Sequence, residues 1–136
     1  MFTFGREKEK QSALYYLSAK DPEKQRVLDL VDSIHDFLEG NGSEESVRTA
    51  LRASFTRTAS GGWEQTGTWL RKPIKHYPSF ESMWLEMADD KDSKVRFRVA
   101  CNIDDMPPHI SDQVYAKLKD DKSKKVSDMA KVRRQG

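Results

Sequence analysis

The sequence predicts an all-α protein whose C-terminal half contains a short helical repeat. Three observations support this class: apolar residues recur at helical spacing, helix-capping residues stand where these patterns begin, and one segment recurs 31 residues later. Hydrophobic residues make up 36% and charged residues 34% of the 136 positions. A thin apolar core under a charged surface is typical of repeat proteins, in which each unit buries one stripe against its neighbour.

Residues 1–57 are expected to form three helices. A short charged helix covers residues 6–19, and a second helix begins at the N-cap Asp21 and ends at Gly40. Ser43 caps the third helix. The apolar faces of the second and third helices comprise Val27, Leu30, Val31, Ile34, Phe37, Leu38, Val47, Ala50, Leu51 and Phe55. Together the three helices would form an N-terminal helical cap.

Residues 58–78 show no clear helical periodicity. Threonine, serine and glycine are frequent there and favour a loop, with a short helix over residues 68–76. Two tryptophans, Trp63 and Trp69, lie in this polar segment. We expect a tryptophan-containing connection between the N-terminal helices and the repeat.

From residue 79 the pattern predicts two similar helical hairpins. Ser79 caps the first helix, and Pro107-Pro108 separates the hairpins. Asp89-Asp90-Lys91 recurs as Asp120-Asp121-Lys122, and Lys94-Val95 recurs as Lys125-Val126. Residues 79–134 therefore contain two copies of helix, acidic turn and helix. One such hairpin cannot bury its apolar stripe alone, so we expect the two to stack.

The first acidic turn and the helix that follows it carry a family resemblance. The segment from Met87 to Ala100 resembles HEAT-like repeats, whose acidic turn is followed by Val-Arg and small apolar residues. Its continuation to Asp120 is similar to the short bacterial form called the leucine-rich repeat variant. The resemblance covers residues 79–134 and implies a short right-handed α-solenoid that presents one face to a partner.

The resemblance also implies a structural role for two residues. In this family the turn aspartate and the arginine that follows valine form a bridge between units. The corresponding residues here are Asp90 and Arg96. The second copy has Ser127 where the first has Arg96. The second copy therefore resembles a degenerate terminal cap.

The motifs predict a protein without catalysis, metal or cofactor. The single cysteine, Cys101, excludes an internal disulfide and suits a small core residue. His35 has acidic neighbours at helical spacing, which is typical of a hydrated helix face. No glycine-rich phosphate loop or His-Glu-x-x-His motif occurs. Neither a signal peptide nor an apolar run near the ~20 residues of a membrane span is present, so we expect a soluble cytoplasmic protein without membrane contact.

A protein is the partner that the sequence favours. Trp63 and Trp69 are candidate interface anchors, with packing over the helical core as the alternative. Arg98 and Asn102 lie four residues apart on the helix that the family geometry turns towards a partner. A small helical protein of this kind suits an inhibitor or antitoxin role, as in bacterial immunity proteins that neutralise a toxin.

Nucleic acid is the alternative partner, because the C-terminal half carries an excess of basic residues. The candidate phosphate contacts are Lys94, Arg98, Lys122, Lys124, Lys125, Arg133 and Arg134. Stacking of the repeats would join these side chains into one stripe. The aromatic residues that would stack on bases are not interleaved with this charge, which argues against the alternative.

Overall fold

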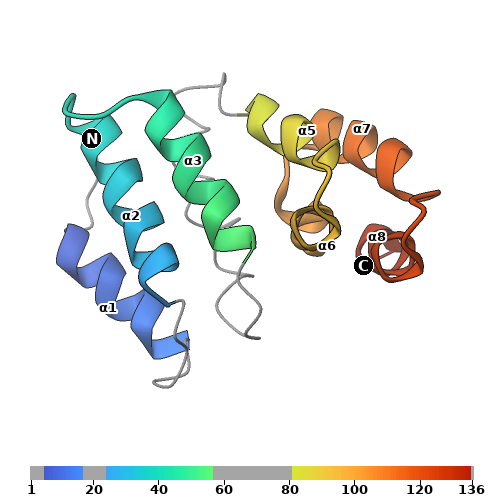
Figure 1. The fold of residues 1–136 in the computed structure, drawn as a ribbon, viewed down its shortest axis with the longest axis horizontal. Helices are drawn as coiled ribbons and strands as arrows, with labels where there is room; N and C mark the ends of the chain where they lie inside the picture. The colour runs from blue at the N-terminus through green and yellow to red at the C-terminus, as the bar shows by residue number, and fades with distance from the viewer. Residues whose placement is uncertain (1–4, 17–23, 57–80, 136) are drawn as a thin grey trace. The chain divides into compact units, whose positions relative to one another are not determined.

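The computed structural model describes residues 5–16, 24–56 and 81–135 (Figure 1). Every regular element in these ranges is a helix, so the predicted all-α class is confirmed. The chain divides into two compact units, Met1–Trp69 and Leu70–Gly136. That they form one domain, as the sequence predicts, stays a prediction. No helix within the described ranges is long and apolar enough to cross a membrane.

The N-terminal unit contains α1 (Arg6–Tyr16), α2 (Lys24–Leu38) and α3 (Glu44–Phe55). α2 contacts both other helices, and α2 and α3 form a hairpin (Figure 1). Gly40 ends the first arm with a φ of 84°, which is left-handed backbone that suits glycine. The Ser43 hydroxyl accepts a hydrogen bond from the Ser46 amide and caps α3. Both predicted boundaries are confirmed, whereas Asp21 lies outside the described residues.

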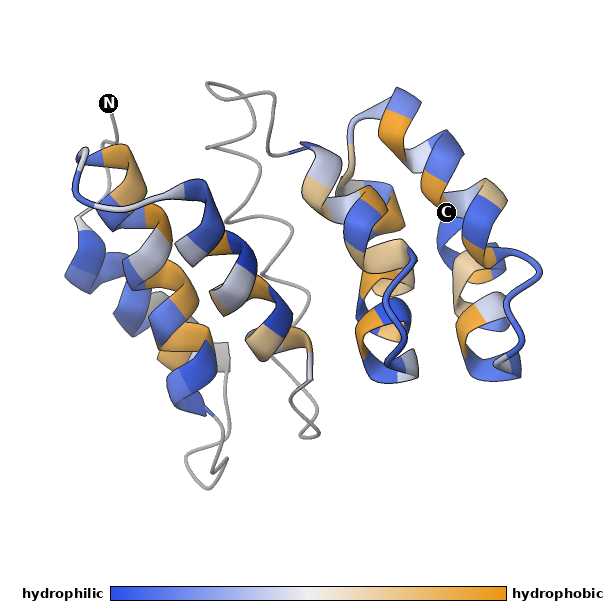
Figure 2. Cartoon of the chain, turned by 45° about the horizontal axis from the view of Figure 1, so that its top comes forward, coloured by the Kyte–Doolittle hydropathy of each residue, from blue (hydrophilic) through white to orange (hydrophobic). Residues whose placement is uncertain are grey.

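The facing stripes of α2 and α3 are the core of this unit, and apolar residues run along both helices in Figure 2. The buried members are Val27, Leu30, Val31, Ile34, Val47, Leu51 and Phe55. Burial of each large apolar side chain contributes about 1.5–3 kcal/mol. Phe37, Leu38 and Ala50 were expected on the same face but are only half-buried. Phe37 and Leu38 stand at the end of α2, where the hairpin opens into its turn.

The C-terminal unit contains α5 (Ser82–Ala88), α6 (Ser93–Cys101), the 3-10 helix η2 (Ile103–Asp105), α7 (Pro108–Leu118) and α8 (Lys124–Gln135). α5 packs on α7 and α6 packs on α8, so like helices of the two hairpins are in contact (Figure 1). Pro108 is the first residue of α7, a position where its missing amide hydrogen removes no helical bond. The expected cap Ser79 lies outside the described residues.

The core of this unit runs through both hairpins. Its buried apolar members include Met83, Trp84, Met87, Val95, Val99, Ala100, Cys101, Ile103, Ile110, Val114, Leu118, Val126 and Ala130. The expected seam from the first hairpin to the second is therefore continuous. Cys101 is a buried free thiol at the end of α6, as a small core residue should be.

Candidate functional site

An ion pair joins the two C-terminal hairpins. The Arg96 guanidinium donates from Nε to Oδ2 of Asp121 at 2.9 Å and from Nη1 to the backbone carbonyl of Asp90 at 2.8 Å. Both side chains of the pair are only 8% exposed. Burial acts to raise the pKa of the Asp121 carboxyl. Hydrogen bonds from Arg96 and the Ser123 amide outweigh burial and hold this pKa below its usual range.

The two turns make the same hydrogen bonds 31 residues apart. A carboxylate oxygen of Asp90 accepts from the Asp92 amide at 2.9 Å, and one of Asp121 accepts from the Ser123 amide at the same distance. The amides of Asp90 and Asp121 donate to the last turns of α5 and α7, respectively. Arg96 therefore links equivalent positions of the two hairpins. The bridging carboxylate is that of Asp121, while Asp90 contributes its backbone carbonyl.

We define the turn edge as residues 89–94 and 120–125, the two acidic turns with the first residues of α6 and α8. Both turns are hydrophilic in Figure 2. Five exposed lysines stand on it, and four of them occupy equivalent positions 31 residues apart: Lys91 with Lys122, and Lys94 with Lys125. None of the four forms an ion pair with another described residue. Lys125 Nζ lies 4.5 Å from the ring centre of Phe97, which holds its ammonium group beside α6.

Several other candidate phosphate contacts are engaged within the unit. Lys124 pairs with Asp128 at 2.6 Å, and Arg133 lies 3.7 Å from Asp104. Arg134 pairs with Asp112 and donates to the Ser111 hydroxyl at 3.1 Å, and Arg98 is buried. Of the seven predicted contacts, Lys94, Lys122 and Lys125 remain exposed without an ion pair to a described residue.

The predicted protein-binding residues are placed differently. Trp63 and Trp69 lie outside the described residues. Asn102 is 0% exposed and Arg98 is 9% exposed. The Asn102 side-chain amide donates to the Arg98 carbonyl at 2.8 Å, so it closes the end of α6. The expected placement of these two residues on a partner-facing surface is therefore wrong, because α6 packs against α5, α7 and α8.

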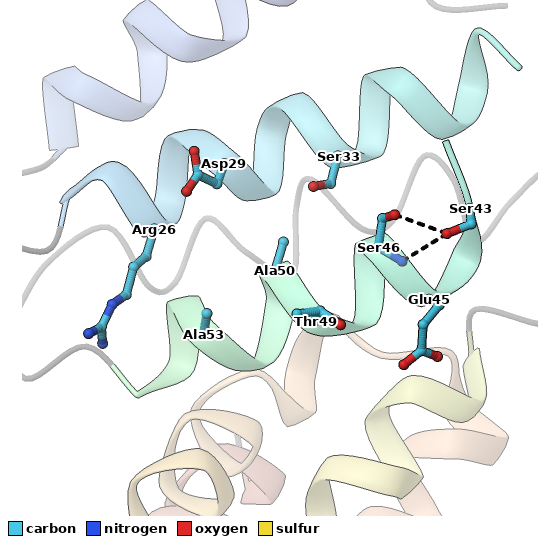
Figure 3. A pocket seen from close by; sticks show the side chains of 9 residues that line it. All are labelled: Arg26, Asp29, Ser33, Ser43, Glu45, Ser46, Thr49, Ala50 and Ala53. Atoms are coloured by element: carbon cyan, nitrogen blue, oxygen red, sulfur yellow. Dashed lines mark hydrogen bonds between the residues drawn. The ribbon is translucent and has the colours of Figure 1, made fainter. Parts of the chain in front are cut away.

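The N-terminal unit has an open groove of about 490 Å³ between α2 and α3 (Figure 3). Its lining residues are Arg26, Asp29, Ser33, Ser43, Glu45, Ser46, Thr49, Ala50 and Ala53. Arg26 lies at one end, where its guanidinium donates to the Thr56 hydroxyl at 3.0 Å. Ser43 and Ser46 are hydrogen-bonded to each other at the other end. The groove thus offers hydroxyl groups and both signs of charge.

Charged side chains also attach α1 to α2. Arg6 donates to Asp36 at 2.6 Å and Glu39 at 2.8 Å, and Lys10 donates to Asp32 at 3.0 Å. The hydrogen bond to Asp36 raises the pKa of the Arg6 guanidinium.

His35 stands on α2 with Asp32 and Asp36 but is 5% exposed, and Glu9 of α1 lies 3.3 Å from its Nε2. The expectation of a hydrated His35 is wrong, because α1 covers this part of α2. No group of three or more metal-ligating side chains is found within the ranges that the structure describes.

Comparison of the chain with protein-family models, curated proteins and solved structures finds no match.

Proposed function

We propose that this chain is a non-enzymatic, protein-binding module built on two HEAT-like hairpins. In this proposal residues 81–135 form a short right-handed α-solenoid, and α1 to α3 are its N-terminal cap. The observation that carries the proposal is the buried pair of Arg96 and Asp121, which fixes one hairpin on the next. The identical turn hydrogen bonds support the same interpretation. A stack fixed in this way offers a preformed surface, which lowers the entropic cost of binding.

The charge pattern of the turn edge favours a protein over a nucleic acid. Each turn begins with two aspartates that precede its lysines, and the first of each pair, Asp89 and Asp120, is exposed. A nucleic-acid surface needs a continuous positive stripe along the phosphates. A surface with both signs of charge instead fixes the register of a complementary protein surface and repels wrong partners.

Nucleic acid is the second candidate, supported by three exposed lysines. Lys94, Lys122 and Lys125 make no ion pair with a described residue and stand on adjacent turns. Three phosphate contacts would give weak binding that falls steeply with salt. This candidate predicts retention of DNA or RNA only at low ionic strength.

Affinity capture tests the proposal. The full chain is immobilised and exposed to extract of the source organism at physiological salt, with and without nuclease. We expect one protein that survives nuclease treatment, binds the purified chain in calorimetry, and is lost with Asp121→Arg, which places a second cation against Arg96. Captured material that disappears with nuclease would overturn the proposal.

An inhibitor or immunity role is the specific form that we propose. A captured partner with enzymatic activity should lose that activity when the purified chain is added in equal amount. A tagged chain should locate to the cytoplasm, the compartment that the sequence predicts. A partner whose activity is unchanged by the chain would contradict the inhibitor role and leave the binding module intact.

A further inference from the structure

We propose that the turn edge binds an extended acidic segment of the partner protein, with Lys94 and Lys125 as the central contacts. This inference rests on the proposed function and names the chemistry of the partner. It would add a specific recognition element to the stacked hairpins. Its starting point is that exposed lysines recur at equivalent positions of two turns that Arg96 ties together.

The spacing of the lysines follows from the packing of the helices. α6 and α8 are in contact, and packed helices lie about 8–10 Å apart. Lys94 is the second residue of α6 and Lys125 is the second residue of α8, so one lysine stands at the start of each helix. In the extended polyproline II conformation three residues make one full turn and rise about 9 Å. Positions i and i+3 of such a segment lie on the same side, so an acidic residue at every third position would meet one lysine from each hairpin.

The lysines are available because the local carboxylates have other partners. Asp121 bonds to Arg96, Asp89 is paired with Lys117 at 3.0 Å, and Asp92 caps α6 through the amide of Lys94. Phe97 holds the Lys125 ammonium group beside α6, and a ligand carboxylate would compete only with this one aromatic contact. The edge is therefore partly ordered before a ligand arrives.

The remaining exposed aspartate gives the edge its selectivity. Asp120 stands on the same turn as Lys122 and Lys125 and would repel a uniformly charged phosphate backbone. A peptide can place a neutral or basic residue opposite Asp120 and acidic residues opposite the lysines. The observations therefore favour an acidic peptide segment over DNA or RNA.

Fluorescence anisotropy of labelled probes with the full chain tests this inference. The first probe is a peptide of about 12 residues with Glu at every third position and Pro or Ser between, which spans both hairpins. The second probe carries the same residues with the Glu clustered at one end, and the third is a single-stranded DNA of similar length. We expect the spaced peptide to bind more tightly than either of the others at equal salt.

Two matched double variants identify the surface. Lys94→Gln with Lys125→Gln should weaken the spaced peptide by about tenfold, the effect expected from losing charge contacts at a surface. Lys8→Gln with Lys131→Gln removes two exposed lysines elsewhere and should change affinity by less than about twofold. Equal losses in the two variants, or tighter binding of DNA than of the spaced peptide, would overturn the inference.

Binding of the captured native partner to the lysine variant distinguishes failure of this inference from failure of the proposed function. If a protein partner is captured and binds Lys94→Gln/Lys125→Gln as tightly as the unaltered chain, the inference about the turn edge is wrong and the binding module stands. If no protein is captured in the first experiment, both are wrong.

Discussion

Arg96 and Asp121 are 25 residues apart in the chain and form a buried ion pair with an N–O distance of 2.9 Å. The arginine belongs to α6 and the aspartate to the turn before α8, so the pair crosses from one hairpin to the other. The same guanidinium donates to the carbonyl of Asp90 in its own hairpin. One side chain therefore ties together both turns and the start of α6.

Removal of one partner of this pair should be more harmful than removal of both. Arg96→Met leaves the Asp121 carboxylate buried without its cation, and the free energy of unfolding should fall by about 3–5 kcal/mol. In Arg96→Met/Asp121→Leu neither charge is left alone, so the double variant should lose less than the sum of the two single variants. Urea unfolding followed by circular dichroism measures the coupling. Additive losses would show that the two residues do not act as a pair.

Acid should weaken the C-terminal unit through Asp121. The pKa of this carboxyl is lower in the folded chain than the ordinary value of about 3.9 for unfolded aspartate. Its contribution to stability is therefore present above about pH 4 and is lost as pH falls through the folded pKa. Asp121→Asn should be less stable at pH 7 and should respond less to acid below pH 4. Asp120→Asn, which removes the exposed neighbouring carboxylate, should keep the stability of the unaltered chain at pH 7.

Local patterns in the sequence predicted most helices and both cores. The end of α2 at Gly40 depends on the conformation of one residue, and the start of α3 at Ser43 depends on one hydrogen bond. Both could therefore be predicted from the local sequence. The buried faces of α2, α3, α6 and α8 follow from helical spacing.

Contacts between helices could not be predicted from local sequence patterns. The 31-residue offset aligned Asp121 with Asp90, but which carboxylate Arg96 reaches depends on how the hairpins stack. His35 was expected in water because the periodicity of α2 carries no information about where α1 packs. Asn102 was expected on a surface, but α6 ends at Cys101 and leaves Asn102 to cap it.

A charge placed in the seam between the hairpins should unfold the C-terminal unit. Val95 is 0% exposed and Met87 is 6% exposed, and an aspartate at either position would be buried without a partner. Val95→Asp and Met87→Asp should each reduce stability by more than about 3 kcal/mol. Val132→Asp is the control, because Val132 is 63% exposed on α8 and should change stability by less than about 0.5 kcal/mol. Thermal unfolding followed by circular dichroism at 222 nm distinguishes the variants. Equal melting temperatures for all three would show that Val95 and Met87 do not lie in a buried seam.

Burial of Arg98 and Asn102 leads to a prediction about stability rather than binding. Arg98→Ala removes a buried stem, and Asn102→Ala removes the amide that bonds to the Arg98 carbonyl. Each should reduce the free energy of unfolding by about 1–3 kcal/mol. Lys94→Ala is a matched control on the exposed side of α6. If Arg98→Ala melts with the unaltered chain, the side chain is not part of the packing of α6.

The attachment of α1 to α2 should be the most salt-sensitive part of the N-terminal unit. The side chains of Arg6 and Lys10 are 29% and 24% exposed, and no described side chain of α1 is fully buried. Partly exposed ion pairs of this kind contribute no more than about 1 kcal/mol and are screened by salt. Hydrogen exchange should therefore show that Arg6→Ala, or molar salt, speeds exchange of the α1 amides and leaves those of α3 unchanged.

Lys8→Ala provides the control for this prediction. Lys8 is exposed on α1 and makes no ion pair with another described residue, so its removal changes helix composition without touching the contact to α2. If Lys8→Ala accelerates exchange in α1 as much as Arg6→Ala does, the effect comes from the helix itself. Faster exchange only in Arg6→Ala would instead locate the attachment at Asp36 and Glu39, the two carboxylates that Arg6 contacts most closely.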